Sequence, residues 1–182
     1  MARRLLWLAV AAVLLPAGLF AQAERKDLQV FLDISREVNG YPRFTVFDDV
    51  AASVTGGEVT LTGRVTMPFK AKDIASRVAK VPGVVSVRND IRVLPTSLFD
   101  DDLRYRISRS IYASPAFWHY ASMSNPPIHI LVENGHVTLT GVVHDDVERA
   151  LARSLASSWG ALSVASQLKT DAEVRASLEK LE

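Results

Sequence analysis

Residues 56–63 read GGEVTLTG and residues 134–141 read NGHVTLTG, so the chain repeats one pattern 78 positions later. The match continues upstream, where residues 34–38 align with residues 107–111 at an offset of 73. This change of offset places an insertion in the second copy. A repeat of this length predicts two copies of one supersecondary unit of about 70 residues.

Each copy contains a β-hairpin pattern. Apolar and polar residues alternate on both sides of Gly56-Gly57 and again on both sides of Asn134-Gly135. Such pairs favour two-residue turns that join antiparallel strands. The expected cross-strand partners are Val54 with Val59, Ala52 with Leu61, Val132 with Val137, and Ile130 with Leu139.

The same alternation predicts which residues face water. One face of each sheet carries the apolar side chains, so the other face is expected to be open to solvent. In the second copy the residues expected on this open face are His129, Glu133, His136 and Thr138.

Helical spacing flanks each hairpin. An apolar stripe over residues 28–38 precedes the first hairpin, and a second stripe over 68–81, opened by Pro68, follows it. In the second copy, Ser97 and Asp100 resemble a capping box, and Asp145 can cap the next helix.

A last strand closes each copy, expected over residues 84–94 and 162–168. The unit therefore reads helix–strand–strand–helix–strand. This order predicts an α+β fold in which two helices pack on a three-stranded sheet, and the chain holds it twice.

The N-terminus has the composition of a signal peptide. Arg3 and Arg4 precede an apolar segment over residues 5–20, and Ala21-Gln22-Ala23 fits a cleavage site. The apolar segment is shorter than the roughly 20 residues that a membrane span needs. We expect a signal peptide over 1–23, domains over 24–95 and 96–169, and a helical tail over 170–182.

Composition limits the function of the secreted chain. Loss of Arg3 and Arg4 with the signal peptide leaves 19 basic residues against 20 acidic ones, and there is no cysteine. A chain this close to neutral is a poor candidate for nucleic-acid binding through counterion release. Without disulfides, its stability must come from packing.

The repeated pattern also resembles a known family. The pattern VTLTG, an alanine-bearing helix and then Pro82-Gly83-Val84-Val85 ahead of Asn89 resemble the BON domain. The second copy departs from it, with Trp159 in place of the proline and Ser166 in place of Asn89. The resemblance covers almost all of the chain after the signal peptide.

This resemblance implies a location and a role. BON domains occur in tandem in bacterial periplasmic proteins with non-enzymatic roles in envelope maintenance, through phospholipid or protein contact. Some members bind anionic phospholipid through the first helix of the second domain. The family supplies no catalytic residues and no cofactor to carry over.

The insertion in the second copy, between Phe117 and Ile128, and the helix before it carry the candidate binding residues. With Leu103 and Ile107 facing the core, helical geometry places Tyr105, Arg109 and Tyr112 together on the opposite face. Aromatic residues interleaved with arginine suit a membrane interface or a protein contact. The candidate lipid- or partner-binding residues are Tyr105, Arg109, Tyr112, Trp118 and Tyr120. The competing interpretation is that Phe117, Trp118 and Tyr120 fold inward as a core between the domains.

The sequence gives little indication of a metal site or of catalysis. The four histidines all lie in the second copy, but His129 and His136 are spaced too far apart along the hairpin to share a metal. We expect no metal, no cofactor and no enzymatic activity. The two hypotheses are a peripheral phospholipid-binding module of the envelope and, as an alternative, a periplasmic protein-binding adaptor or chaperone-like factor.

Overall fold

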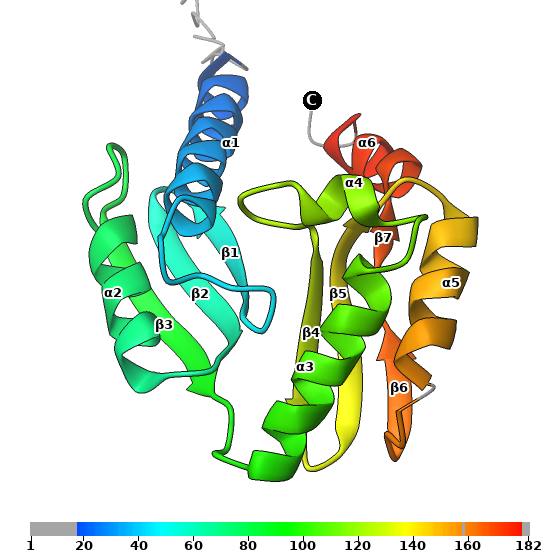
Figure 1. Ribbon diagram of the computed structural model, residues 1–182. Helices are drawn as coiled ribbons and strands as arrows, with labels where there is room; N and C mark the ends of the chain where they lie inside the picture. The colour runs from blue at the N-terminus through cyan, green and yellow to red at the C-terminus, as the bar shows by residue number, and fades with distance from the viewer. Residues whose placement is uncertain (1–17, 158, 180–182) are drawn as a thin grey trace, which may run out of the picture.

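The computed structural model describes residues 18–157 and 159–179. Most of the predicted signal peptide lies outside these residues. The described chain forms two α+β units side by side, each with helices packed on one face of a sheet (Figure 1). The α+β repeat expected from the sequence is thus confirmed.

The first unit follows the predicted element order. Its elements are α1 (Gly18–Asn39), β1 (Asp49–Thr55), β2 (Glu58–Val65), α2 (Pro68–Val78) and β3 (Ser86–Val93). Pro68 occupies the first turn of α2, where its missing N–H costs no hydrogen bond.

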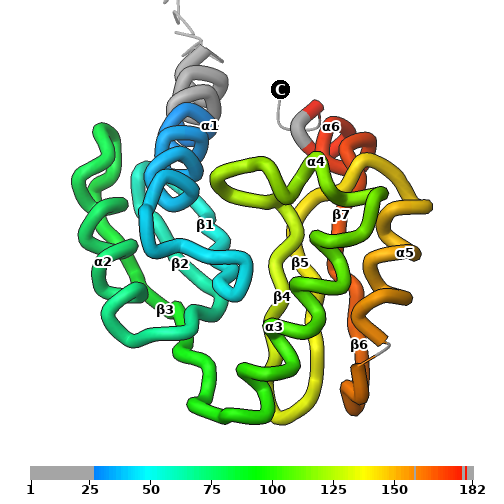
Figure 2. Tube along the Cα trace, viewed as in Figure 1, coloured from blue at the N-terminus to red at the C-terminus, as the bar shows by residue number. Residues whose placement is uncertain are grey.

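The second unit adds three short elements to the same order. It contains α3 (Leu98–Tyr112), α4 (Trp118–Ala121), β4 (Ile128–Glu133), β5 (His136–Val143), α5 (Asp146–Ser157), β6 (Ser163–Ser166), β7 (Lys169–Thr170) and α6 (Asp171–Glu179). The tube view shows the insertion with α4 crossing above β4, and α6 beside it (Figure 2). The predicted last strand is split, since β6 and β7 pair with β5 on either side of residues 167–168.

Both hairpins have the predicted register. Val54 pairs with Val59 and Val132 with Val137, and the third strand of each unit runs parallel to the second. Asn134 and Gly135 both have positive φ, as a type I′ turn requires.

Two glycines at equivalent positions allow the hairpins to close. A Cβ on Gly63 would lie 2.1 Å from the Asp49 carbonyl oxygen, and one on Gly141 would lie 1.8 Å from that of Pro127. Because both residues also have φ above 100°, no other residue fits without displacing backbone. Each hairpin therefore requires a glycine at this position of its second strand.

Each unit has its own hydrophobic core. The first is centred on Ile34, Leu61 and Ile74, and the second on Ile107, Leu139 and Phe117, all fully buried. The aligned positions Ile34 and Ile107 therefore play the same role. No helix among the described residues is long and apolar enough to span a bilayer.

One prediction about the open sheet faces is wrong. His129 was expected to face solvent, but it is buried, as is Leu131 beside it on the same face of β4. The segment before β1 covers this part of β4: the Ile130 amide donates to the Val46 carbonyl at 2.6 Å. The ring of Phe44 lies 5.5 Å from the His129 ring. Contact between the units, which the repeat pattern does not encode, explains the burial.

Candidate functional site

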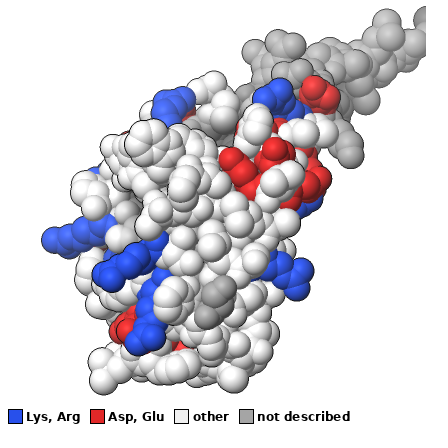
Figure 3. Space-filling view, turned by 45° about the vertical axis from the view of Figure 1, so that its right-hand side comes forward, with Lys and Arg blue, Asp and Glu red and all other residues white. Residues whose placement is uncertain are grey.

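The outer surface of α3 and α4 carries three of the candidate residues. Tyr105 is 65% exposed and Trp118 is 74% exposed, and Arg109 is also exposed. In the space-filling view, basic side chains project from the edge of the second unit that carries α3, next to a face towards α5 with few charges (Figure 3). These three side chains form what we call the α3–α4 surface.

The other two candidates point inward. Tyr112 is partly buried and its hydroxyl donates to the Ile128 carbonyl, while Tyr120 is buried and donates to Glu148 at 2.8 Å. Burial raises the pKa of Tyr112, and burial together with the Glu148 carboxylate raises the pKa of Tyr120 to about 12. The expected exposure is thus wrong for Tyr112. Tyr120 does fold inward, but into its own unit, where its hydroxyl has a polar partner.

The inserted segment is anchored by its inward side chains. Phe117 is fully buried in the core of the second unit, and its ring stacks on that of Tyr120. These two anchors leave Trp118 between them on the outside. The segment is therefore neither wholly exposed nor a core between the domains, which were the two interpretations of the sequence.

The α3–α4 surface borders the first unit. The Tyr105 ring meets Phe47 edge to face, with centroids 5.2 Å apart. Arg106 pairs with Asp102 on the same helix, whereas Arg109 has no ion pair within the described part of the chain. Arg109 is thus free to bind an external anion, one helical turn from the exposed ring of Tyr105.

An apolar end of the second unit was not predicted. Leu98 is 90% exposed, and Phe99 and Leu162 both lie against the turn at Gly135. Trp159, near Leu162 in sequence, is also exposed. The apolar pair Leu98-Phe99 after the cap Ser97 was the sequence feature that could have indicated it.

Two aspartates hold the hairpin turns, a role that the sequence reading missed. The Asp27 carboxylate accepts from the amides of Gly56 and Gly57, and the Asp100 carboxylate accepts from those of Asn134 and Gly135. Ser97 caps α3 as predicted, but Asp100 binds the turn instead of completing the capping box. The two aspartates lie 73 positions apart, which is the offset of the aligned helices. That offset could have revealed them.

The point where the second strand meets the next helix differs between the units. In the first, the buried Asp48 carboxylate accepts from Lys70 at 2.6 Å and from the backbone and hydroxyl of Thr66. Burial opposes ionisation, but these donors, led by Lys70, hold the pKa of Asp48 below its usual value. In the second, Tyr120 and Glu148 occupy this place, and both accept from the His144 amide.

The histidines are dispersed. His136 contacts the Ser163 hydroxyl, His144 lies near Asp171, and the His119 ring packs on Tyr120. Among the described residues, no group of three or more histidines and carboxylates could hold a metal ion.

Comparison with known proteins identifies the repeat. The sequence model of the BON domain matches residues 33–95 and again residues 100–172. None of the curated proteins compared with the chain matches it.

Solved structures show a weaker likeness. The C-terminal domain of CdsD, a structural protein of the type III secretion system of Chlamydia trachomatis, is 16% identical over 82% of this chain and 68% of that chain, with a TM-score of 0.34. A second CdsD structure is 13% identical over 83% of this chain and 97% of its own, with a TM-score of 0.30. Scores this low carry no argument about this chain. The two matches to the BON domain model, by contrast, coincide with the two structural units. The chain therefore belongs to the BON domain family and contains two BON domains.

Proposed function

We propose that this protein is a non-enzymatic binding module of the bacterial envelope that contacts anionic phospholipid through the α3–α4 surface. BON domains are associated with phospholipid- and envelope-related roles. The observation that carries the proposal is the exposure of Tyr105, Trp118 and Arg109 on α3 and α4, where Arg109 has no ion pair among the described residues.

The chemistry of this surface fits a headgroup layer. Tyrosine and tryptophan place an apolar ring and a polar tip at the boundary between water and lipid. A guanidinium binds phosphate oxygens through paired donors, and each basic residue near an anionic membrane contributes about 1 kcal/mol. With only a few such groups, binding should be peripheral, reversible and sensitive to salt.

The apolar end formed by Leu98, Phe99, Trp159 and Leu162 favours the second candidate, a protein-binding adaptor. Exposed aromatic and aliphatic side chains in one place are typical of protein contacts. The nearest charged residues on α3 include Asp101 and Asp102, which do not suit an anionic membrane. A protein held there would stay bound when salt is raised.

Co-sedimentation with vesicles tests the first function. The protein in its processed form, without the predicted signal peptide, is mixed with vesicles of phosphatidylcholine alone or with added phosphatidylglycerol, at low and moderate salt. We expect binding only to the anionic vesicles, weakened by salt. The triple variant Tyr105→Ala, Arg109→Ala, Trp118→Ala should bind at least about tenfold more weakly.

The first unit offers a matched control. Leu32 and Arg36 occupy on α1 the positions that Tyr105 and Arg109 occupy on α3, since the offset is 73. The double variant Leu32→Ala, Arg36→Ala should bind vesicles like the unmodified protein. Equal binding by both variants, or equal binding to neutral vesicles, would refute the α3–α4 surface as a lipid site and favour a protein partner.

A further inference from the structure

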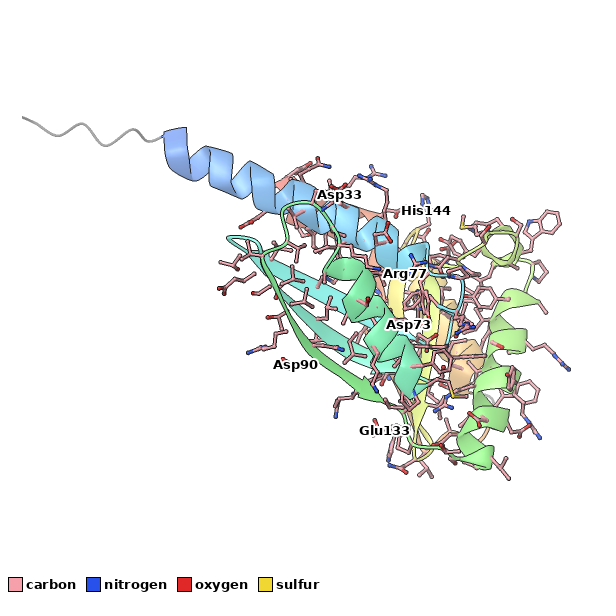
Figure 4. The ribbon with its side chains drawn as sticks, turned by 90° about the vertical axis from the view of Figure 1, so that its left-hand side faces the viewer. Asp33, Asp73, Arg77, Asp90, Glu133 and His144 are labelled. Atoms are coloured by element: carbon pink, nitrogen blue, oxygen red, sulfur yellow. The ribbon has the colours of Figure 1, made fainter. Side chains whose placement is uncertain are left out.

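A cavity of about 340 Å³ lies between the two domains, where the free faces of their sheets meet. Its walls come from β1, β2 and β3 on one side and from β4, β5 and residue 167 on the other. Figure 4 shows Asp90 on the face of the first sheet away from α1, with Glu133 at the end of β4. Ligand pockets usually begin at about 300 Å³ and often lie between domains, so the volume suits only a small molecule.

Two arginines stand side by side in this cavity. Arg64 on β2 is in register with Arg92 on β3, and both line the cavity. Like charges on neighbouring strands destabilise a sheet unless something compensates them. The same register position in the second domain holds Val142 and Lys169, so the pair is not part of the BON repeat in this chain.

Carboxylates near the two arginines balance their charge. Asp49 is the cross-strand partner of Arg64 on β1, and it has no ion pair within the described residues. Asp90 lines the cavity too, but Arg88 engages it at 2.9 Å. Glu133 lies only loosely against Arg64, at 3.7 Å. The charges that line the cavity therefore cancel while remaining separated in space.

A hydrogen-bonding group in the opposite wall is unused. Thr140 is only 7% exposed, and its buried hydroxyl has no partner among the described residues. It lines the cavity together with Thr138 from the same face of β5. A buried hydroxyl without a partner costs free energy, and a polar ligand that turns this side chain toward the cavity would remove that cost.

We propose that this cavity binds a small zwitterion. Its oxyanion, a carboxylate or a phosphate, binds between Arg64 and Arg92 and accepts a hydrogen bond from Thr140, while its ammonium group faces Asp49. A neutral site with separated charges favours a ligand whose charges are separated in the same way, over a simple anion or cation. Two sources carry this chemistry: a free amino acid and the phosphoethanolamine headgroup of a lipid.

Titration followed by NMR tests the site on the processed protein. Glycine and glycerophosphoethanolamine represent the two sources, while succinate and ethanolamine supply the oxyanion and the ammonium separately. We expect one zwitterion to shift the amide signals of Thr138 and Thr140 with a dissociation constant on the order of millimolar. The zwitterion that binds more tightly identifies the source.

Variants separate this site from general charge effects. Arg92→Gln should weaken binding of the zwitterion about tenfold. Lys169→Gln, at the equivalent position of the second domain, should leave it unchanged, and neither should alter vesicle binding through the α3–α4 surface. The proposal is overturned if neither zwitterion shifts these amides, if succinate binds as tightly, or if the two variants behave alike.

Discussion

At the scale of single residues, the aspartates that hold the hairpin turns are expected to contribute strongly to the stability of the fold. Asp100 is fully buried, and its carboxylate accepts from two backbone amides that otherwise lack an acceptor. Hydrogen bonds to a charged acceptor contribute more than neutral ones, about 1.5–3 kcal/mol each. One side chain therefore joins the start of α3 to the tip of the hairpin.

We predict that Asp100→Ala lowers the free energy of unfolding by about 2–4 kcal/mol, because both turn amides lose their acceptor. Urea denaturation measures the change. Asp102→Ala is the control, since Asp102 lies in the same first turns of α3 but is exposed and pairs only with Arg106. A similar loss in both variants would mean that the effect comes from the helix dipole and not from the turn.

At the scale of elements, the two domains fasten the last strand differently. In the first, the Asn89 side chain donates to the Ala71 carbonyl of α2 at 3.0 Å and accepts from the Ile91 amide. In the second, Ser166 stands at this position, and its buried hydroxyl has no partner among the described residues. Arg149 of α5 instead donates to the Leu168 carbonyl.

We predict opposite outcomes for changes at these aligned positions. Asn89→Ser should destabilise the protein by about 1–2 kcal/mol, because it removes one hydrogen bond between β3 and α2 and one within β3. Ser166→Ala should be neutral or slightly stabilising, because the hydroxyl that it removes has no partner. Urea denaturation gives both values, and faster hydrogen exchange at the Ile91 amide should accompany Asn89→Ser alone. Equal destabilisation by both changes would contradict this account.

The elements were also the part of the structure that the sequence predicted best. Alternation at period two and glycine-containing turns specify a hairpin locally, so the pairing of Val54 with Val59 could be predicted without any distant contact. The burial of His129 could not, because it depends on residues 44–48 of the other domain. The residues of the candidate site show the same contrast. The exposure of Tyr105 could be predicted from helical spacing alone. The inward position of Tyr120 could not, because its partner Glu148 lies 28 residues away.

At the scale of the whole molecule, residues 44–48 connect the two domains. The Asp48 carboxylate fixes this segment by accepting from the backbone and hydroxyl of Thr45, and Val46 then accepts from the β4 amide of Ile130. Asp48, which binds Lys70 inside the first domain, thus also holds the segment that contacts the second domain. His129 is the titratable side chain of β4 at this contact.

His129 should make the contact between the domains sensitive to acid. Burial against Phe44 lowers the pKa of His129 below its usual 6.5, and the nearby carboxylates of Asp49 and Asp48 only partly oppose this. The folded protein therefore keeps His129 neutral at a pH where the unfolded chain protonates it. Stability should be complete above about pH 6.5 and should fall as the pH drops below it, by at most about 1.4 kcal/mol per pH unit from this group.

His129→Leu should remove this loss, because leucine fills the same apolar space and does not titrate. Urea denaturation between pH 5 and pH 7 measures the slope, and His136→Gln, which changes an exposed histidine, should leave it intact. Hydrogen exchange at the Ile130 amide distinguishes two possible origins of the loss of stability in acid. If acid acts at the contact between the domains, this amide should exchange faster before the core of either domain opens. If the amide instead exchanges together with the core amides, His129 stabilises the second domain alone and the two domains do not separate in acid.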